Sequence, residues 1–272
     1  MYKNRLIGGL SFALALILTP TLPSLAFGAD EVEEVVAVGS RREARSVSDS
    51  PAPVDIISGS DFVNQGAMDL PDMIRTMVPS FNVNTQPISD AATLIRPANL
   101  RGLPPDDMLV LVNGKRRHRG AVISFLGSGI SDGAQGPDIS AIPSIALKQV
   151  EVLRDGAAAQ YGSDAIAGIM NFVYKDNAEG TQVEIRSGSY KEGDGDAWRI
   201  AANVGMPFTD DGFANLSVEL QESDATSRSV QRADAQGLYD GGNTNIWNYP
   251  LPAQTWGSPE VSDDLKLVLN LG

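Results

Sequence analysis

The last third of the chain alternates apolar and polar residues with the two-residue period of a β-strand. In residues 198–206, Ile200 and Val204 fall on one side of such a strand, and Asn203 falls on the other. The same alternation occurs in residues 181–190, 214–221 and 265–271. Strands of this kind form the wall of an outer-membrane β-barrel, but a soluble β-sandwich has the same period. The alternation alone therefore leaves both folds open.

The lengths of the connections favour the barrel. Residues 207–212 form a short turn, whereas residues 222–264 form a long segment rich in Gly, Asn, Ser and Pro. Outer-membrane barrels have short periplasmic turns and long external loops. The long segment also carries Trp247, Tyr249 and Trp256. These aromatic residues either stack on a ligand or belong to an interfacial girdle, and the sequence leaves both readings open.

Residues 54–176 predict an α+β domain with a small mixed sheet and short helices. Strands are predicted at 54–57, 108–112, 148–154 and 169–174, and a short helical turn is predicted at 157–161. A longer helix begins at Asp69, tolerates Pro71 in its first turn and ends before Pro79. Asn113 and Gly114 are typical of a tight turn after the second of these strands.

The N-terminus has the pattern of a secretory signal peptide. Lys3 and Arg5 precede the uncharged apolar run 6–18, which is too short to span a bilayer. We therefore predict a cleaved signal peptide at 1–28, a flexible linker at 29–53 and the α+β domain at 54–176. Residues 177–272 are predicted to form the first strands, about four, of an incomplete outer-membrane β-barrel.

Composition excludes several kinds of site. The 272 residues include no cysteine, and His118 is the single histidine. Thiol catalysis, cysteine-ligated zinc, iron–sulfur clusters and disulfides are therefore excluded, and a metal site or catalytic triad would depend on one histidine. With 34 acidic and 21 basic residues, the net charge of −13 disfavours binding to nucleic acid. We predict no catalytic residues, no metal site, no cofactor and no enzymatic activity.

Three segments resemble the plug domain of TonB-dependent outer-membrane receptors. Residues 142–173 read IPSIALKQVEVLRDGAAAQYGSDAIAGIMNFV, residues 99–102 read NLRG, and residues 109–114 read LVLVNG. The resemblance implies that the chain is a plug followed by the first antiparallel strands of a transmembrane barrel of about 22 strands. It also implies structural roles for the signature residues Arg101, Gly102, Glu151, Arg154, Gly156, Tyr161, Gly162, Asp164, Gly168 and Asn171.

Residues 33–38 lie where this family keeps its TonB box. The segment consists of Glu33, Glu34, Val35, Val36, Ala37 and Val38, with Ala37 and Val38 in place of the more usual Val-Thr pair. The resemblance implies that the box adds a strand to the sheet of the TonB C-terminal domain. An inner-membrane motor would then pull on the plug and open a path for the substrate.

Two groups of charged residues are candidates for further roles. Arg116, Arg117, His118 and Arg119 belong to a dense basic run and are candidates to face an anionic ligand. The alternatives are a solvated loop, or ion pairs with acidic residues of the barrel wall. Arg101, Arg154 and Glu151 are expected to form ionic contacts between plug and barrel, because buried charges require partners.

The sequence therefore predicts import of a scarce nutrient across a Gram-negative outer membrane. A ferric siderophore is the default ligand, with a carbohydrate or cobalamin as alternatives. The plug and the box are expected to face the periplasm, and the strands are expected to contact outer-membrane lipid. Because four strands leave unpaired edges, the chain is expected to be an N-terminal portion of the receptor. The alternative is a plug-type binding module that stands alone and does not transport.

Overall fold

The computed structural model describes residues 35–36, 45–46, 53–84, 92–124, 129–226, 232–243, 245 and 257–272. The predicted signal peptide lies outside these residues, as do Glu33, Glu34, Ala37 and Val38 of the predicted box and the aromatic residues Trp247, Tyr249 and Trp256. No helix within the described ranges has the length and apolar character needed to cross a membrane.

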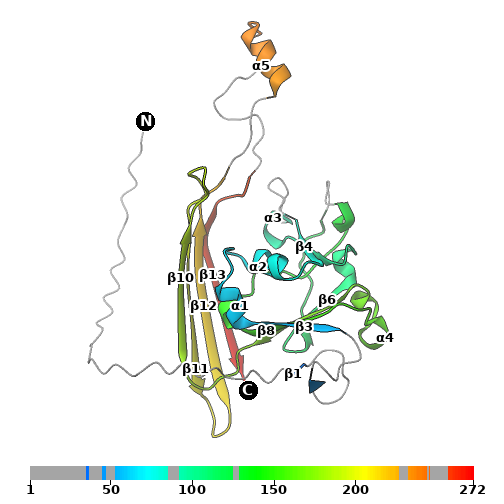
Figure 1. Cartoon of the computed structure of the whole chain (residues 1–272), viewed down its shortest axis with the longest axis vertical. Coiled ribbons are helices and arrows are strands. Elements are labelled where there is room, and N and C mark those ends of the chain that lie inside the picture. Colours follow the sequence, from blue (N-terminus) through cyan, green and yellow to red (C-terminus); the bar gives the residue numbers. More distant parts are fainter. Residues whose placement is uncertain are drawn as a thin grey trace, which may run out of the picture. The chain divides into compact units, whose positions relative to one another are not determined.

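A five-stranded mixed sheet organises the first part of the fold (Figure 1). Its strand order is β3 (Val54–Ser58), β8 (Leu147–Leu153), β9 (Gly168–Tyr174), β6 (Met108–Val112) and β7 (Lys115–Arg116). Strands β6 and β9 are parallel, and the other pairs are antiparallel. Asn113 and Gly114 join β6 to β7 with φ of 48° and 73°, as the tight-turn prediction requires.

Shorter elements surround this sheet. They are β1 (Val35–Val36), β2 (Arg45–Ser46), α1 (Gly59–Val63), α2 (Leu70–Met77), β4 (Phe81–Val83), α3 (Ala92–Ile95), β5 (Ala98–Leu100), the 3-10 turns at Pro105–Asp107, Gly129–Ser131, Ser144–Ala146 and Ser163–Ala165, and α4 (Ala158–Tyr161). β4 and β5 form a separate antiparallel pair. Phe62 of α1 and Met73 and Ile74 of α2 are buried in the larger hydrophobic cluster against the sheet.

Helix α2 shows how the sequence specifies a local element. Asp69 occupies the N-cap position and Pro71 lies in the first turn, as predicted. Met73 and Ile74 are fully buried because their spacing places both on the side that faces the core. The carboxylate of Asp69 makes no capping hydrogen bond and instead forms an ion pair with Arg96.

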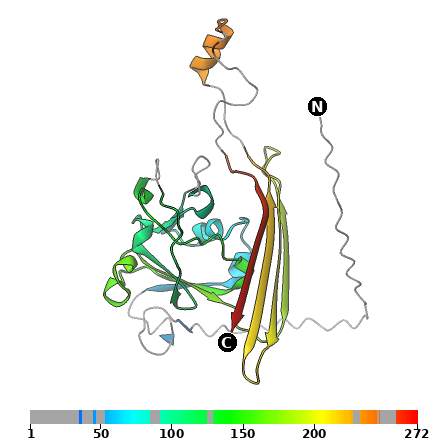
Figure 2. The ribbon, with the colours of Figure 1, turned by 180° about the vertical axis from the view of Figure 1, so that it is seen from behind.

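The last part of the fold is an antiparallel sheet of four long strands. It consists of β10 (Thr181–Gly188), β11 (Ala197–Pro207), β12 (Phe213–Ser223) and β13 (Val261–Leu271), and the short helix α5 (Ala233–Asp240) lies between the last two in the chain. Figures 1 and 2 show the four strands side by side from opposite directions. We call this sheet the wall. Each of its strands overlaps one of the four alternating stretches in the sequence.

Burial on the two faces of the wall is the reverse of that in a soluble sandwich. The apolar side chains of Ile185 and Leu267 are 75% and 64% exposed. On the opposite face, Arg199 and Glu219 are each 1% exposed. A sandwich would bury the apolar face, whereas a lipid-facing wall exposes it. The burial pattern therefore decides between the two folds that the alternation left open.

Candidate functional site

Arg199 of β11 joins the wall to the mixed-sheet domain. Its Nη2 donates to Glu184 Oε2 at 2.9 Å, and its Nη1 lies 3.3 Å from Glu219 Oε2. The same Nη1 donates to Ser144 Oγ at 2.7 Å, in the turn that precedes β8. The Arg199 side chain is 1% exposed, so these bonds form away from water and replace its hydration.

Arg186 of β10 makes a second contact of this kind, with backbone carbonyls. Its Nη2 donates to the Phe62 carbonyl at 2.7 Å, and its Nη1 donates to the Gln65 carbonyl at 2.6 Å. Both carbonyls lie at or just after the C-terminal end of α1, and the Phe62 carbonyl also accepts the Gln65 N–H. Arg186 therefore fixes this loop to the wall.

Amide side chains continue the interface toward the end of the wall that carries the short turn 208–212. Asn215 Nδ2 donates to Asn177 Oδ1 at 2.9 Å, and Asn270 Nδ2 donates to the Lys175 carbonyl at 2.9 Å. Asn113 Nδ2 donates to Asn270 Oδ1 at 3.1 Å. The polar face of the wall thus binds the mixed-sheet domain along most of its length.

Two predicted signature residues form a buried polar group within the mixed sheet. Asn171 Nδ2 donates to Glu151 Oε2 at 3.0 Å, and Gln149 Nε2 donates to Glu151 Oε1 at 2.8 Å. Asn171 Oδ1 accepts the Gly114 N–H at 2.9 Å. Asn171 therefore ties the β6–β7 turn to the centre of the sheet.

We expect Asn171→Leu to lower the free energy of unfolding by about 2 kcal/mol, because it removes a buried hydrogen bond to the Glu151 carboxylate, which stays buried, and a partly buried hydrogen bond to the Gly114 N–H. Urea unfolding of the full chain in detergent, followed by circular dichroism, measures the change. Asn245→Leu, at an exposed residue, is the control and should change stability by less than about 0.5 kcal/mol. Equal effects of the two substitutions would contradict the role assigned to Asn171.

The ionic contacts predicted for Arg154 are corrected by the structure. Arg154 pairs with Asp55 of the neighbouring strand β3, at 2.6 Å between Nε and Oδ2, and among the described residues it forms no ion pair with the wall. Arg154 lies directly after the C-terminal end of β8. Ser144, which contacts the wall, lies in the turn before the N-terminal end of β8. Arg101 is exposed, with a φ of 57°, and Glu151 is bound by Gln149 and Asn171 of its own sheet.

The other signature residues lie around α4. Ala158–Tyr161 forms α4, Gly162 follows with a φ of 103°, and Tyr161 packs against the smaller hydrophobic cluster. Asp164 pairs with Arg116 of β7. Gly156 and Gly102 lie in the connections after β8 and β5, and Gly168 begins β9 with a φ of 134°.

The basic run makes contacts within the mixed-sheet domain. Arg116 binds Asp164 and the Tyr161 carbonyl, and Arg119 lies 3.2 Å from Asp106. Arg117 is half-buried, and His118 is exposed. The contact with an anionic ligand stays a prediction for all four candidates. Within the described ranges, no group of three or more His, Asp or Glu side chains is placed to hold a metal ion.

A cluster that the sequence did not reveal surrounds Arg96. This side chain pairs with Asp69 and Asp72, the latter at 3.1 Å, and joins the residues after α3 to the start of α2. Burial lowers the pKa of Arg96 and raises the pKa of Asp72, and the charges of Asp138 and Arg75 oppose these shifts. No local motif signals this cluster, because Arg96 follows Asp72 by 24 residues.

Burial also shifts the pKa of two residues between the mixed sheet and the wall. It raises the pKa of Tyr174, against the charge of Arg117, and lowers the pKa of Lys175, against the charge of Glu184. Lys175 Nζ donates to Gln182 Oε1 at 2.5 Å. Lys175, the first residue after β9, therefore packs against the wall through its side chain.

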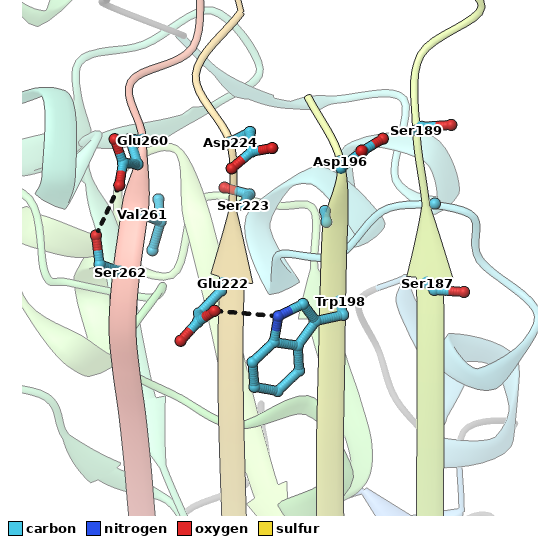
Figure 3. A pocket seen from close by; sticks show the side chains of 12 residues that line it. Ser187, Ser189, Asp196, Trp198, Glu222, Ser223, Asp224, Glu260, Val261 and Ser262 are labelled. Carbon is cyan, nitrogen blue, oxygen red and sulfur yellow. Dashed lines mark hydrogen bonds between the residues drawn. The ribbon is translucent and has the colours of Figure 1, made fainter. Parts of the chain in front are cut away.

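An open cleft of about 560 Å³ lies at the ends of the wall strands next to the long connection (Figure 3). Trp198 Nε1 donates to Glu222 Oε2 at 3.1 Å across neighbouring strands. The cleft is lined by Ser187, Gly188, Ser189, Asp196, Ala197, Trp198, Glu222, Ser223, Asp224, Glu260, Val261 and Ser262. This lining contains four carboxylates and no basic residue, which disfavours an anionic ligand here.

Part of the predicted TonB box has an extended backbone. Val35 and Val36 form β1 and pair antiparallel with Ser46 and Arg45 of β2. Strand addition to a partner sheet requires such a conformation. Binding to TonB stays a prediction.

A sequence model of the TonB-dependent receptor plug domain matches residues 46–169. This range contains the whole mixed sheet except the last residues of β9. Residues 46–169 belong to the TonB-dependent receptor plug domain family. The mixed-sheet domain is the plug, and the wall is the beginning of the barrel that such receptors have. The fold class predicted from the sequence is confirmed.

Known members of this family resemble the chain over most of its length. The vitamin B12 transporter BtuB of Photobacterium profundum is 25% identical over 216 residues, which are 79% of this chain and 32% of that protein. The ferric enterobactin receptor PirA of Pseudomonas aeruginosa is 30% identical over 161 residues, which are 58% of this chain and 21% of that protein.

A solved structure shows the same relation. The siderophore receptor PirA of Acinetobacter baumannii is similar with a TM-score of 0.51 and 26% identity, over 65% of this chain and 25% of that one. The chain thus spans about a third or less of the length of these relatives. These relatives are named as receptors and transporters.

Proposed function

We propose that this chain forms the plug and the first wall strands of a transporter that imports a scarce nutrient across the Gram-negative outer membrane. The observation that carries the proposal is the inverted wall. Its apolar face is exposed, whereas its polar face binds plug carbonyls and the Ser144 hydroxyl through Arg186 and Arg199. A plug held inside a lipid-facing wall blocks passage until it is moved, as active import requires.

The division of the chain follows from the same proposal. Residues 1–28 serve as a cleaved signal peptide, residues 29–53 as the box and linker, residues 54–176 as the plug and residues 177–272 as wall. The mature protein resides in the outer membrane. Its plug and box face the periplasm, and its long connection between β12 and β13 faces outward.

The ligand class is a ferric siderophore by default. The names of two relatives, a ferric enterobactin receptor and a siderophore receptor, support this choice, and the vitamin B12 transporter keeps cobalamin as the alternative. A carbohydrate is the third candidate. Uptake of radiolabelled ferric enterobactin and cyanocobalamin, compared in the same cells, distinguishes the first two.

Energy is proposed to come from TonB, which binds the box as an added strand. Deleting residues 33–38 from a receptor that contains the full chain should abolish energised uptake and leave ligand binding unchanged. Uptake and binding of the labelled ligand at 0 °C and 37 °C separate the two steps. Uptake that survives the deletion would contradict the assignment of the box.

A matched pair of substitutions tests the mode of binding. Val36→Pro removes a backbone N–H and should lower uptake by at least tenfold, because proline cannot complete a strand ladder. Val36→Ala keeps the backbone donor and should retain most of the uptake. Equal loss in both variants would show that the valine side chain, and not strand addition, carries the contact.

The second candidate function is a plug-type module that binds a ligand without transporting it. The plug signature supports it as much as it supports a transporter. Membrane fractionation combined with heat-modifiability on a gel distinguishes the two, because a closed barrel migrates differently before and after boiling. A soluble periplasmic product would favour the module.

A further inference from the structure

The β6–β7 turn of the plug contains the single Asn-Gly pair of the sequence, Asn113 and Gly114. Both residues are exposed, and both have a positive φ, 48° and 73°. In such a pair, the backbone nitrogen of the glycine can attack the side-chain amide carbon of the asparagine, because the glycine has no side chain to obstruct the approach. The turn therefore carries two groups that can react with each other, within reach of water.

In the folded chain, hydrogen bonds hold each group that this reaction uses. The Gly114 N–H donates to Asn171 Oδ1 at 2.9 Å. Asn113 Oδ1 accepts the Tyr174 N–H at 2.8 Å, and Asn113 Nδ2 donates to Asn270 Oδ1 of β13 at 3.1 Å. The attacking nitrogen and the carboxamide are thus fixed separately, so the reaction requires that the turn first opens.

Three of these contacts belong to a closed ring that joins the plug to the wall. Asn270 Nδ2 donates to the Lys175 carbonyl at 2.9 Å, and Lys175 follows Tyr174 in the chain. A backbone N–H can only donate. The Tyr174 N–H therefore requires the oxygen of Asn113 on its side and directs the NH2 group toward Asn270. The ring needs an amide at residue 113, because a carboxylate has no hydrogen to donate to Asn270.

We propose that Asn113 is a deamidation site, which is inert while the ring is closed and reactive once the β6–β7 turn opens. The Gly114 nitrogen forms a bond to Asn113 Cγ, the Cγ–Nδ2 bond breaks, and Nδ2 leaves as ammonia with the former Gly114 amide proton. Water then hydrolyses one of the two bonds between that nitrogen and the carbonyl carbons of the succinimide. The products are aspartate and isoaspartate, and no oxidant or reductant takes part.

Either product prevents the ring from closing again. Its carboxylate is ionised at neutral pH and places an acceptor opposite Asn270 Oδ1. If the Asn270 amide turns over, its oxygen faces the Lys175 carbonyl, and that hydrogen bond is lost instead. Isoaspartate also lengthens the backbone of a two-residue turn. Deamidation is therefore a one-way change that weakens the contact between the plug and β13.

The rate of conversion at Asn113 tests the proposal. The full chain is incubated in detergent at neutral pH, and mass spectrometry of its proteolytic peptides measures the fraction converted. We expect conversion to be about a hundredfold slower in the folded chain than in the same chain unfolded in urea, because three hydrogen bonds of ordinary strength hold the reacting groups. Equal rates in the two states would overturn the proposal.

Two variants separate opening of the turn from unfolding of the whole chain. Asn270→Ala breaks the ring on the wall side and should speed conversion of Asn113 about fivefold. Asn203→Ala is the matched control, because it removes an amide that is bonded within the wall, to Asn215 and Ser217. It should leave the rate unchanged. Equal acceleration by both variants would show that conversion follows global unfolding and would refute a site controlled by the ring.

Asn113→Asp reproduces one product and tests its effect on the contact. It should lower the urea midpoint of unfolding, and adding Asn270→Ala should lower the midpoint no further than the larger single effect, because both changes break the same ring. Additive losses would show that the product leaves the ring intact. This inference goes beyond the proposed function and does not rest on it, since neither TonB nor a substrate takes part.

Discussion

Replacing Arg199 by methionine should lower the free energy of unfolding of the full chain by about 3–5 kcal/mol. The substitution leaves the carboxylates of Glu184 and Glu219 buried with less positive charge, and it removes the hydrogen bond to Ser144. Arg186 and Lys266 remain near these carboxylates and limit the loss. Urea unfolding in detergent, followed by circular dichroism, measures the difference.

A double-mutant cycle separates the ion pair from the rest of the effect. Arg199→Met combined with Glu219→Gln should cost less than the sum of the two single substitutions, because the second change removes a charge that the first left unpaired. Arg116→Met is the control, since its partner Asp164 lies on the same domain and Arg116 is half exposed. It should cost about 1 kcal/mol or less. Additive effects of Arg199 and Glu219 would show that their contact is not energetically coupled.

Gly168→Ala should lower the free energy of unfolding by about 3 kcal/mol or prevent folding of the plug. The φ of Gly168 is 134°, and an added Cβ would overlap the Leu153 carbonyl oxygen and lie 2.9 Å from Leu100 Cδ2. Both the backbone conformation and the contact therefore exclude a side chain. The yield of folded protein and its urea midpoint report the change.

Gly114→Ala separates these two causes. Gly114 also has a positive φ, 73°, but an added Cβ would meet no atom within 4 Å. Gly114→Ala should lower the free energy of unfolding by about 1 kcal/mol, which is the effect of the backbone conformation alone. If Gly168→Ala and Gly114→Ala cost the same, the close approach of β9 to Leu153 would have no energetic role.

Local patterns predicted most of the elements correctly. The alternation predicts all four wall strands, although β13 begins at Val261, before the alternating run at 265–271. Asn113 and Gly114 adopt the positive φ values that a tight turn requires. These features depend on neighbours in the chain, so the sequence carries their full signal.

The partners of the charged residues could not be predicted in the same way. The sequence predicts ionic contacts between plug and barrel, yet Arg186 and Arg199 of the wall bind plug carbonyls and a serine hydroxyl. Every residue has a backbone carbonyl. The sequence therefore does not indicate which carbonyl accepts a hydrogen bond from the wall. The ion pair of Arg154 with Asp55 depends on the strand order β3-β8, which joins segments 99 residues apart.

By itself, the sequence determined which residues form strands, which face of each wall strand is apolar, and which family the plug signature resembles. These properties depend on spacing along the chain and on residue type. The tertiary structure alone decided that the apolar face is the exposed one, because exposure depends on what packs against each face. It also decided that two arginines of the wall hold the plug at one end of its edge strand, since that contact depends on how β3 and β8 pair and on where the plug meets the wall.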